Sequence, residues 1–404
     1  MFTATSAVCV TGLAVRDTGT GFTLFGQLVI LALIQAGGLG VMTFSLLVFA
    51  LFRSAVPLVH RTIFEQTLGG SAGEYLHRLV RLVFVFAFTA ESLGAAALFI
   101  RFLAEMPAGE AAYAAVFHAV SAFCNAGFGL WPDSLTAYRS DLWVNATVMT
   151  LIVLGGLGFI VVHDLIEARR QRRRTSVHSK LALVVSAVLI AGGALGFWLL
   201  EAPRLLYGMP LGEQILASLF QSVTARTAGF NTVDIGTLAP GTHFLLILLM
   251  LVGGSPGSCA GGIKTTTLGV LLLAAHSRLR GRLNVNAFRR TLSPTTVRNT
   301  LSIAVGGFFV VVVGLFALLV TEAPESGVVN DRAAFLSYLF ETVSALGTVG
   351  LTTGVTPFLH ASSRMLIVVL MFVGRLGPLT VASALVASRP LDDWRYPEED
   401  VMVG

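Results

Sequence analysis

Long apolar stretches alternate along the chain with short segments that mix hydroxyl, glycine and aromatic residues. The apolar stretches are long enough to cross about 30 Å of hydrocarbon as helices. The hydrophobic pattern predicts spans at about 23–51, 82–104, 142–163, 181–200, 242–273, 300–320 and 364–387. The fifth span is interrupted by glycine and proline. We therefore expect an all-α polytopic membrane protein.

One short pattern recurs four times between the spans. Each copy reads Phe, two residues, Val or Thr, Ser or Thr and Ala, and ends at a Gly followed by Leu or Phe. The copies lie at 2–13, 117–128, 220–230 and 340–351. They are too short to cross a bilayer, where irregular backbone is tolerated only if it lines a cavity or is buried in protein. Four equivalent short helices predict four walls around one axis.

The order of span, short segment and span divides the chain into four pseudo-repeated units. The predicted units are 1–52, 53–168, 169–276 and 277–388, followed by a tail at 389–404. The first unit lacks its first helix, because Phe2 begins the short segment directly. We therefore expect the natural reading frame to extend upstream by roughly 30–50 residues, enough for one more span.

Composition and charge agree with a membrane location. Hydrophobic residues make up 55% of the chain and charged residues only 12%, about half the charge of a soluble domain. Most of the 27 basic residues lie in the connections between units, as at 169–174 and 278–298, or in the tail. The positive-inside rule then predicts that these connections and the C-terminus are cytoplasmic in a multi-pass protein of the cell membrane. Topology explains the basic charge, so we expect no nucleic-acid partner.

The turn after each short helix is suited to binding a cation. A helix C-terminus carries partial negative charge, and glycine permits backbone dihedrals that a side chain resists. Carbonyl oxygens held in a ring can replace the water around K⁺. The predicted ion-binding residues are Val10, Thr11 and Gly12, Asn125, Ala126 and Gly127, Thr227, Ala228 and Gly229, and Thr348, Val349 and Gly350. K⁺ at this filter is the only metal that we expect, and the chain shows no cofactor motif.

The interrupted fifth span carries five glycines and a proline at 253–262. Glycine costs about 1 kcal/mol and proline about 3 kcal/mol inside a helix, so this span is predicted to break. The stretch superficially resembles a phosphate-binding loop, but Ile263 separates Gly262 from Lys264 and no strand precedes it. Arg375 lies within the last span, where an isolated charge is expensive enough to suggest a function.

These motifs resemble the Trk/Ktr/HKT superfamily of potassium transporters, and most of all the membrane subunit of bacterial Ktr systems. The resemblance covers nearly the whole chain. It is carried by Val-Thr-Gly-Leu at 10–13, Asn-Ala-Gly-Phe at 125–128, Arg-Thr-Ala-Gly-Phe-Asn-Thr at 226–232, Thr-Val-Gly-Leu at 348–351 and the glycine-rich runs at 253–267 and 374–380. It implies four helix–pore loop–helix units around one pore, with one filter glycine in each. Gly12, where sodium-passing relatives often carry Ser, resembles the potassium-selective type.

The resemblance also implies a gate and partners. The gate is an intramembrane loop at about 253–263 that faces an arginine of the last span; it comprises Gly253, Gly254, Gly257, Gly261, Gly262, Lys264 and Arg375. The implied function is potassium uptake, and whether Na⁺ couples to or activates it is left open. The implied partners are a second copy of the chain and a cytoplasmic nucleotide-binding ring.

A membrane receptor or a membrane-embedded enzyme is the alternative, but the short loops show no nucleophile triad, zinc site or carboxylate pair, so we expect no enzyme. Glu91 is equally compatible with a structural and a pore-facing role. Arg226 is expected to brace the short segments, and His118 and Glu341 to be structural. The three cysteines are expected to be inert packing residues.

Overall fold

The computed structural model describes residues 1–53, 72–322 and 331–377, which are mostly helical. The helices that fall on the predicted spans, which we call the long helices because α10 and α11 together make up one span, are α3 Leu24–Arg53, α5 Ala72–Phe102, α7 Leu142–Arg170, α8 Val177–Glu201, α10 Pro240–Met250, α11 Thr265–Leu279, α12 Pro294–Thr321 and α14 Ala361–Leu376. They occupy the predicted spans, and the interrupted fifth span is the pair α10 and α11. The end of the seventh predicted span and the tail at 389–404 lie outside the described residues.

Four other helices, which we call the short helices, carry the recurring sequence pattern. These are α1 Phe2–Val8, α6 Ala108–Phe123, α9 Leu211–Thr224 and α13 Asp331–Gly347. Each is followed by an irregular turn and then by one short helical turn: α2 Thr18–Gly21, η1 Thr136–Tyr138, η2 Ile235–Thr237 and η3 Thr356–Phe358. A long helix follows in every case. The order of elements therefore repeats along the chain in step with the sequence pattern.

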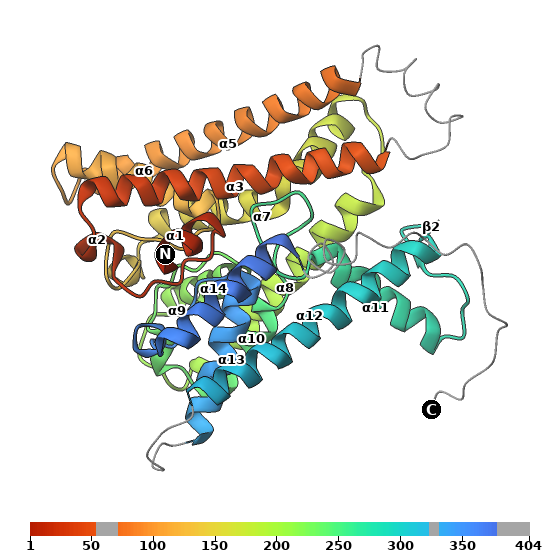
Figure 1. Ribbon diagram of the computed structural model, residues 1–404. Coiled ribbons are helices and arrows are strands. Elements are labelled where there is room, and N and C mark those ends of the chain that lie inside the picture. Colours follow the sequence, from red (N-terminus) through yellow and green to blue (C-terminus); the bar gives the residue numbers. More distant parts are fainter. Residues whose placement is uncertain (54–71, 323–330, 378–404) are drawn as a thin grey trace.

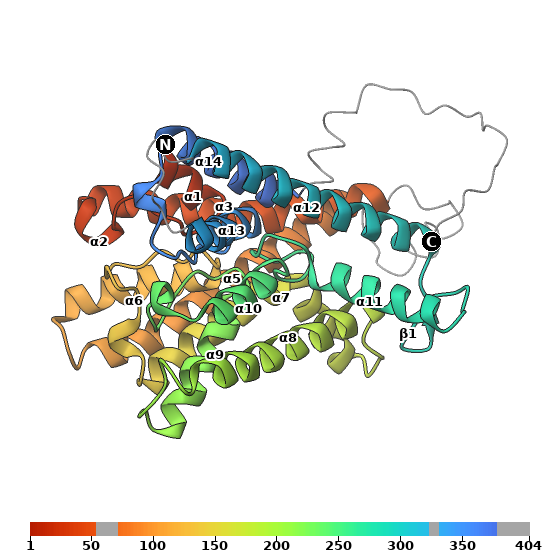
Figure 2. The same cartoon turned by 90° about the horizontal axis from the view of Figure 1, so that it is seen from below.

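The helices pack as a closed arrangement (Figures 1 and 2). Each short helix lies on the long helices beside it in sequence: α1 on α3, α6 on α5 and α7, α9 on α8, and α13 on α12 and α14. Between these groups, α3 packs on α5, α7 on α8 and α9, and α10 on α13. The arrangement closes where α1, at the N-terminus, packs against α14. Helices from opposite ends of the chain are thus neighbours.

A small hairpin connects α11 to α12 and was not expected from the sequence. Strands β1 (Asn286–Ala287) and β2 (Arg290–Thr291) are antiparallel. Phe288 and Arg289 form the turn with φ values of 50° and 65°, in a region that usually calls for Gly or Asn. The Lys180 ammonium lies 5.9 Å from the centroid of the Phe288 ring. This contact ties the hairpin to the beginning of α8.

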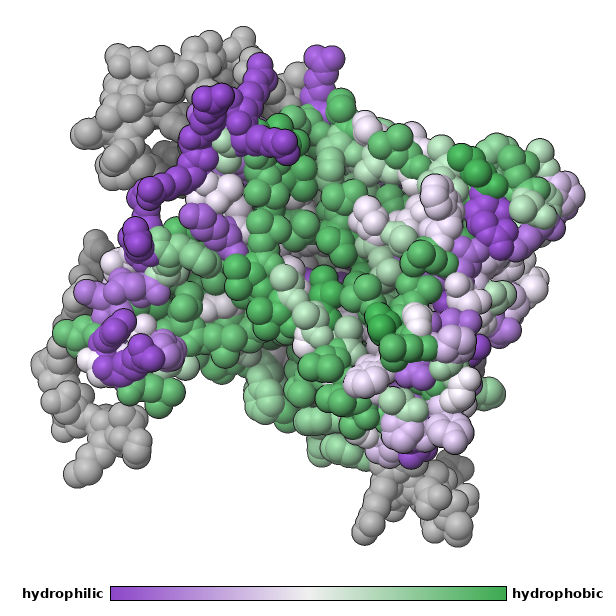
Figure 3. Space-filling view, turned by 180° about the vertical axis from the view of Figure 1, so that it is seen from behind, coloured by the Kyte–Doolittle hydropathy of each residue, from purple (hydrophilic) through white to green (hydrophobic). Residues whose placement is uncertain are grey.

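Apolar side chains cover the middle of the molecule. Among the described residues, four helices are long and apolar enough to cross a membrane: Val80–Phe102 within α5, α7, α8 and α12. Large hydrophobic side chains on these helices are exposed, including Leu93, Val188, Leu195, Phe308 and Phe316. Figure 3 shows a broad apolar surface on one face of the molecule, with hydrophilic residues gathered toward the ends. A bilayer is the surrounding that such a surface requires.

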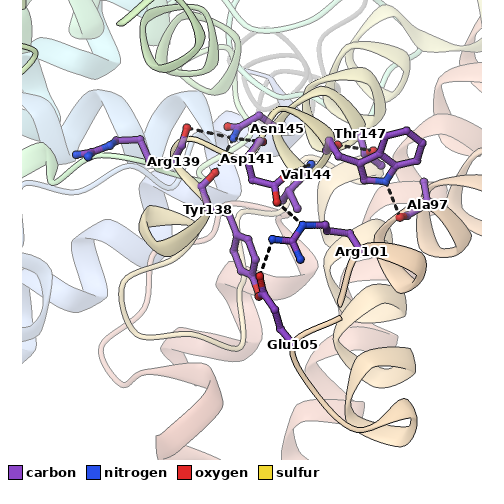
Figure 4. Close-up of polar contacts among 10 residues, drawn as sticks. Ala97, Arg101, Glu105, Tyr138, Arg139, Asp141, Val144, Asn145 and Thr147 are labelled. Carbon is purple, nitrogen blue, oxygen red and sulfur yellow. Dashed lines mark hydrogen bonds and ion pairs between the residues drawn. The ribbon is translucent and has the colours of Figure 1, made fainter. Parts of the chain in front are cut away.

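A polar cluster joins the end of α5 to the start of α7 (Figure 4). Arg101 bonds to Asp141, which caps α7, and to Glu105 at 2.6 Å. The Tyr138 hydroxyl donates to Glu105 at 2.9 Å, and the Asn145 side chain donates to the Tyr138 carbonyl at 2.7 Å. Burial, followed by the bond to Glu105, raises the pKa of Tyr138 to about 12. The phenol therefore keeps its proton, and this bond persists at neutral pH.

Carboxylates make the corresponding connection in the two groups that follow. Glu201, the last residue of α8, accepts a hydrogen bond of 2.9 Å from the Ala239 amide at the start of α10. Glu322, which follows α12, accepts one of 2.8 Å from the His360 amide at the start of α14. An anionic acceptor is favourable at the positive end of a helix. Each first span thus caps the second span of its own group.

Candidate functional site

The turns after α1, α6, α9 and α13 share an unusual backbone path. The glycine that ends each pattern has a positive φ: 94° at Gly12, 70° at Gly127, 79° at Gly229 and 90° at Gly350. The residue two positions earlier also has a positive φ: 55° at Val10, 57° at Asn125, 70° at Thr227 and 50° at Thr348. Non-glycine residues rarely adopt such values. The four turns therefore share one backbone conformation.

The four glycines meet in a ring, in which each approaches the backbone of the next copy. A Cβ atom added to Gly12 would lie 2.6 Å from the Ala126 oxygen, and one on Gly127 would lie 2.8 Å from the Gly229 Cα. A Cβ atom on Gly229 would lie 2.6 Å from the Val349 oxygen, and one on Gly350 would lie 2.1 Å from the Thr11 oxygen. We call these four residues the glycine ring. Backbone approach this close leaves no room for a side chain at any of its members.

The hydroxyl residue of the pattern braces every turn. The residue before each ring glycine donates its amide to the carbonyl of that hydroxyl residue. The pairs are Thr11 to Ser6 at 2.8 Å, Ala126 to Ser121 at 2.8 Å, Ala228 to Thr224 at 2.9 Å and Val349 to Ser344 at 2.8 Å. In addition, the Ser6 and Ser344 hydroxyls accept from the amides of Gly12 and Gly350, both at 3.1 Å. The backbone bond is thus common to all four turns, and the hydroxyl adds a second bond to the ring glycine in the first and fourth turns.

In three of the four copies, the residue after the shared Phe holds the chain that leaves the turn. His118 accepts from the Leu130 amide at 3.4 Å, and Gln221 donates to Thr232 at 3.4 Å. Glu341, which is fully buried, accepts from the Thr353 amide at 3.1 Å. The expectation that His118 and Glu341 are structural agrees with these contacts.

Three threonine hydroxyls near the glycine ring lack hydrogen-bond partners among the described residues. These are Thr11, Thr227 and Thr348, each with at most 1% of its surface exposed. Buried polar atoms are normally satisfied, so three orphans beside one ring of backbone turns form a polar environment without charge. Uncharged oxygen ligands are suited to holding a dehydrated monovalent cation.

The chain between α10 and α11 is a compact loop, and we call residues 251–264 the glycine-rich loop. Its ends are joined by backbone hydrogen bonds: Gly253 to Ile263 at 2.9 Å, Ile263 to Leu251 at 3.2 Å and Thr265 to Gly254 at 3.0 Å. Gly257 and Gly262 have φ values of 76° and 63°. The break predicted from the composition of 253–262 is therefore present, and the loop is folded on itself.

The glycine-rich loop lies directly against two of the orphan threonines. A Cβ atom on Gly261 would lie 2.2 Å from the Thr348 hydroxyl. A Cβ atom on Gly253 would lie 3.0 Å from the Thr227 methyl carbon. Glycine at these positions lets the loop approach the turns that carry the glycine ring. The residues predicted for the filter and for the gate are thus in contact, while their roles stay predictions.

Three basic side chains hold the glycine-rich loop through its carbonyl oxygens. Arg375 of α14 donates to the Cys259 carbonyl and, at 2.7 Å, to the Gly37 carbonyl of α3. Lys264 donates to the Ala260 carbonyl at 2.6 Å. Arg375, 9% exposed, therefore links the loop to the first and last long helices.

Arg226 makes the third of these contacts. It donates to the Gly253 carbonyl at 3.2 Å and to the Ser186 hydroxyl of α8 at 3.1 Å. This arrangement agrees with the expected bracing role, because the side chain bonds to neighbouring backbone and to a span.

A second set of repeated glycines lies in the long helices after the turns, and its role was not expected from the sequence. Cβ atoms on Gly37, Gly155 and Gly374 would lie 2.0, 1.9 and 1.8 Å from the carbonyls of Val8, Phe123 and Leu346, respectively. Each of these carbonyls is four residues before a ring glycine. The signal was available as Gly-Gly-Leu-Gly at 37–40 and 155–158 and Gly-Arg-Leu-Gly at 374–377.

Glu91 of α5 lies in a buried polar contact near the second turn. Its two carboxylate oxygens each accept from the Gln35 side chain at 3.0 Å. The Cys124 thiol lies 3.6 Å from the Gln35 oxygen. The sulfurs of Cys124 and Cys259 both lie within 3.5 Å of the position that a Cβ on Gly38 would take. Thiols distant in sequence are therefore close together, and all three cysteines are free and buried.

Comparison with known proteins places this arrangement in a family. The sequence model of the TrkH family, described as a cation transport protein, matches residues 1–393. The chain belongs to the TrkH family of cation transport proteins. The resemblance inferred from the motifs is thereby confirmed.

Individual relatives of this TrkH-family chain agree. It is 41% identical to Ktr system potassium uptake protein B of Bacillus subtilis, covering 100% of this chain and 89% of that protein. It is 38% identical to potassium/sodium uptake protein NtpJ of Enterococcus hirae, with coverage of 100% and 89%. These relatives are named as transporters and not as enzymes, which confirms the expectation that the chain is not an enzyme.

A solved structure shows the same fold. The potassium transporter TrkH from Vibrio parahaemolyticus matches with a TM-score of 0.71 at 19% identity, covering 96% of this chain and 77% of that one. At this identity the similarity is evidence for the fold alone. It agrees with the predicted all-α membrane architecture.

Proposed function

We propose that this TrkH-family protein takes up K⁺ across the cell membrane through a pore whose selectivity filter is the glycine ring. One observation carries the proposal: four glycines from four separate turns, all with positive φ, approach one another's backbones. The relatives named as potassium uptake proteins support K⁺ as the transported ion. The orphan threonines add uncharged oxygens beside the ring.

The proposed pore is surrounded by four units, with the boundaries 1–52, 53–168, 169–276 and 277–388. The repeated order of elements and the repeated turn geometry support this division. The end of α3, the start of α5 and the β hairpin lie at one end of the molecule (Figure 1). Because the connections there are rich in arginine, that end is the cytoplasmic one in this proposal.

The glycine-rich loop is the proposed gate. It lies against Thr227 and Thr348 on the proposed cytoplasmic side of the ring, and Arg375 holds it through the Cys259 carbonyl. A guanidinium next to the ion path would also repel a cation. Opening would then require the loop to leave Arg375 and the threonines.

Partners complete the proposal. The relatives' name denotes a Ktr system, which implies more than one component. In this proposal the chain is a homodimer whose arginine-rich face receives a nucleotide-binding regulatory ring. Na⁺ is the candidate coupling or activating ion, since one relative is named a potassium/sodium uptake protein. Regulated transport by the chain purified without any other subunit would contradict the ring.

The filter is tested by uptake in a bacterial strain that lacks its own K⁺ transport. Expression should restore growth at low K⁺ and give Rb⁺ uptake; absence of both from membrane-inserted protein would refute the proposal. Gly229→Ser and Gly350→Ser should lower the preference for Rb⁺ over Na⁺, because a Cβ at either position meets neighbouring backbone within 2.6 Å. Gly109→Ser in α6 is the matched control, since nothing lies within 4 Å of a Cβ there. Unchanged selectivity in both ring variants would contradict the assignment.

A further inference from the structure

Helix α7 is interrupted beside the glycine-rich loop. Gly158 has φ 75° and ψ 157° inside an otherwise helical segment, a combination open essentially only to glycine. A Cβ atom on Gly158 would lie 2.7 Å from the Gly257 oxygen and 2.8 Å from the Ser258 nitrogen. The interruption therefore lies where α7 meets the backbone of the loop.

Two carbonyls just before the interruption bind the loop. The Gly155 carbonyl accepts from the Cys259 amide at 3.2 Å, and the Gly156 carbonyl accepts from the Ser255 amide at 2.8 Å. In an unbroken α-helix these carbonyls would accept from the amides of residues 159 and 160. The turn of the backbone at Gly158 breaks that register and makes the two acceptors available to the loop.

Side chains just after the interruption enclose the tip of the loop. A Cβ atom on Gly257 would lie 2.9 Å from Ile160 and 3.1 Å from the Phe159 ring. Residues 155–160 of α7, which we call the docking segment, thus contact the loop through both backbone and side chains. The segment belongs to the second unit and the loop to the third.

We infer that the docking segment is a moving part of the gate: α7 is bent while the loop is docked and straightens when the loop leaves. The reason is hydrogen-bond exchange. Buried carbonyls must stay bonded, and those of Gly155 and Gly156 have two alternative sets of donors, the loop amides or the amides of their own helix. These two carbonyls therefore stay bonded only if undocking of the loop and straightening of α7 occur together. Gly155, Gly156 and Gly158 are positioning residues and do not contact the ion.

The inference rests on the proposed gating role of the loop, so the experiment measures loop position separately from transport. Cys259 is 1% exposed and reports whether the loop is docked. In a full-length Cys9→Ala, Cys124→Ala background it is the only cysteine. Gly158→Ala should favour the straight helix and release the loop. We expect N-ethylmaleimide to modify Cys259 about tenfold faster in this variant than in the background protein, because the undocked loop would change from a minor to a major conformer.

Gly40→Ala is the matched control, because Gly40 is the same position of the same Gly-Gly-Leu-Gly sequence in α3 and a Cβ there meets nothing within 4 Å. Its labelling rate should equal that of the background. If Gly158→Ala does not fold, Ile160→Ala weakens the contact with Gly257 without touching the α7 backbone and should also speed labelling. Unchanged labelling in the variant that folds would overturn the inference. Faster labelling with unchanged Rb⁺ uptake would uphold docking and refute the loop as the gate.

Discussion

Helices α3 and α7 contain the same four residues, Gly-Gly-Leu-Gly, at 37–40 and 155–158, yet they differ in shape. In α3 the last glycine, Gly40, is helical with open space around it. In α7 its counterpart Gly158 has φ 75° and touches the backbone of Gly257. The local sequence permits the break in the helix, and the glycine-rich loop packs against α7 where the break occurs. The same four-residue sequence thus adopts two backbone conformations, because the segments packed against it differ.

The second spans of the third and fourth units, α10–α11 and α14, also contain glycines with positive φ. Helix α14 ends at Gly377, whose φ of 86° and ψ of 138° resemble those of Gly158. In the third unit the span opens into the glycine-rich loop, with Gly257 at φ 76°. A glycine in the second span of each unit therefore allows the backbone to leave the helical path, and Gly158, Gly257 and Gly377 do so. An inserted stretch with a proline turns a bend into a complete break in the third unit alone.

The largest effect on Rb⁺ uptake is expected at Gly37 and Gly155, the equivalent positions at which α3 and α7 make the same close contact. Gly37→Ala and Gly155→Ala each place a Cβ within 2.0 Å of a carbonyl at the end of α1 or α6. Overpacking against backbone costs about 1–3 kcal/mol, which corresponds to a loss of Rb⁺ uptake of about 5- to 150-fold when it displaces a turn that carries the glycine ring. Surface expression measured in parallel separates lost folding from lost transport. Normal uptake in either variant would show that this contact is not needed.

A large effect in the opposite direction is expected from making the third span resemble α3. Deleting residues 255–262 removes the part of the loop that contacts Thr348 and the docking segment. Rb⁺ flux should rise about tenfold, as for an open state that is normally a minor one. Single-channel or liposome flux measurements would check it. Equal or lower flux through a correctly inserted deletion protein would refute the proposal that the loop is the gate.

A smaller increase is expected from Arg375→Ala. The variant loses the bonds to the Cys259 and Gly37 carbonyls, but the loop keeps its bonds to α7. Flux should rise about threefold, the size expected for a partial shift between states. Arg364→Ala is the control, because Arg364 lies in the same helix, is only half-buried, and its side chain bonds to the nearby Pro357 carbonyl and not to the glycine-rich loop. Wild-type flux in Arg375→Ala would argue against its proposed hold on the loop.

The smallest effect is expected where α3 differs from α7. Gly40→Ala adds a methyl group to a helical position with free space, so helix propensity should stabilise the protein by about 0.5–1 kcal/mol. A thermal melt of detergent-purified protein would show a slightly raised midpoint. A lowered midpoint would mean that α3 also needs to bend at Gly40.

The sequence predicted much of the fold because long apolar runs and a fourfold motif are strong local signals. The spans, the short helices and the break between α10 and α11 occur where they were expected. The positive φ of Gly12 and its three equivalents agrees with the expectation that glycine is needed at the end of each copy of the pattern. The contact of Arg375 with the loop followed from the family resemblance.

Other features could not be predicted, since they depend on contacts between distant segments. The bend at Gly158 has the same local sequence as the straight segment at Gly40 and arises from packing against Gly257. The hairpin turn at Phe288 and Arg289 lacks the usual turn residues, and one of its observed contacts is with Lys180. Such features require knowledge of the fold before the sequence can be interpreted.

The bond from Arg375 to the Gly37 carbonyl joins residues 338 positions apart. A ribosome has therefore made nearly the whole protein before this bond can form. The approach of Gly350 to Thr11, which completes the glycine ring, is delayed in the same way. During synthesis, an incomplete chain has neither the complete glycine ring nor the Arg375 bond between the glycine-rich loop and α3. Both contacts require residues of the fourth group of helices, so under the proposed function the filter and its gate would be completed together.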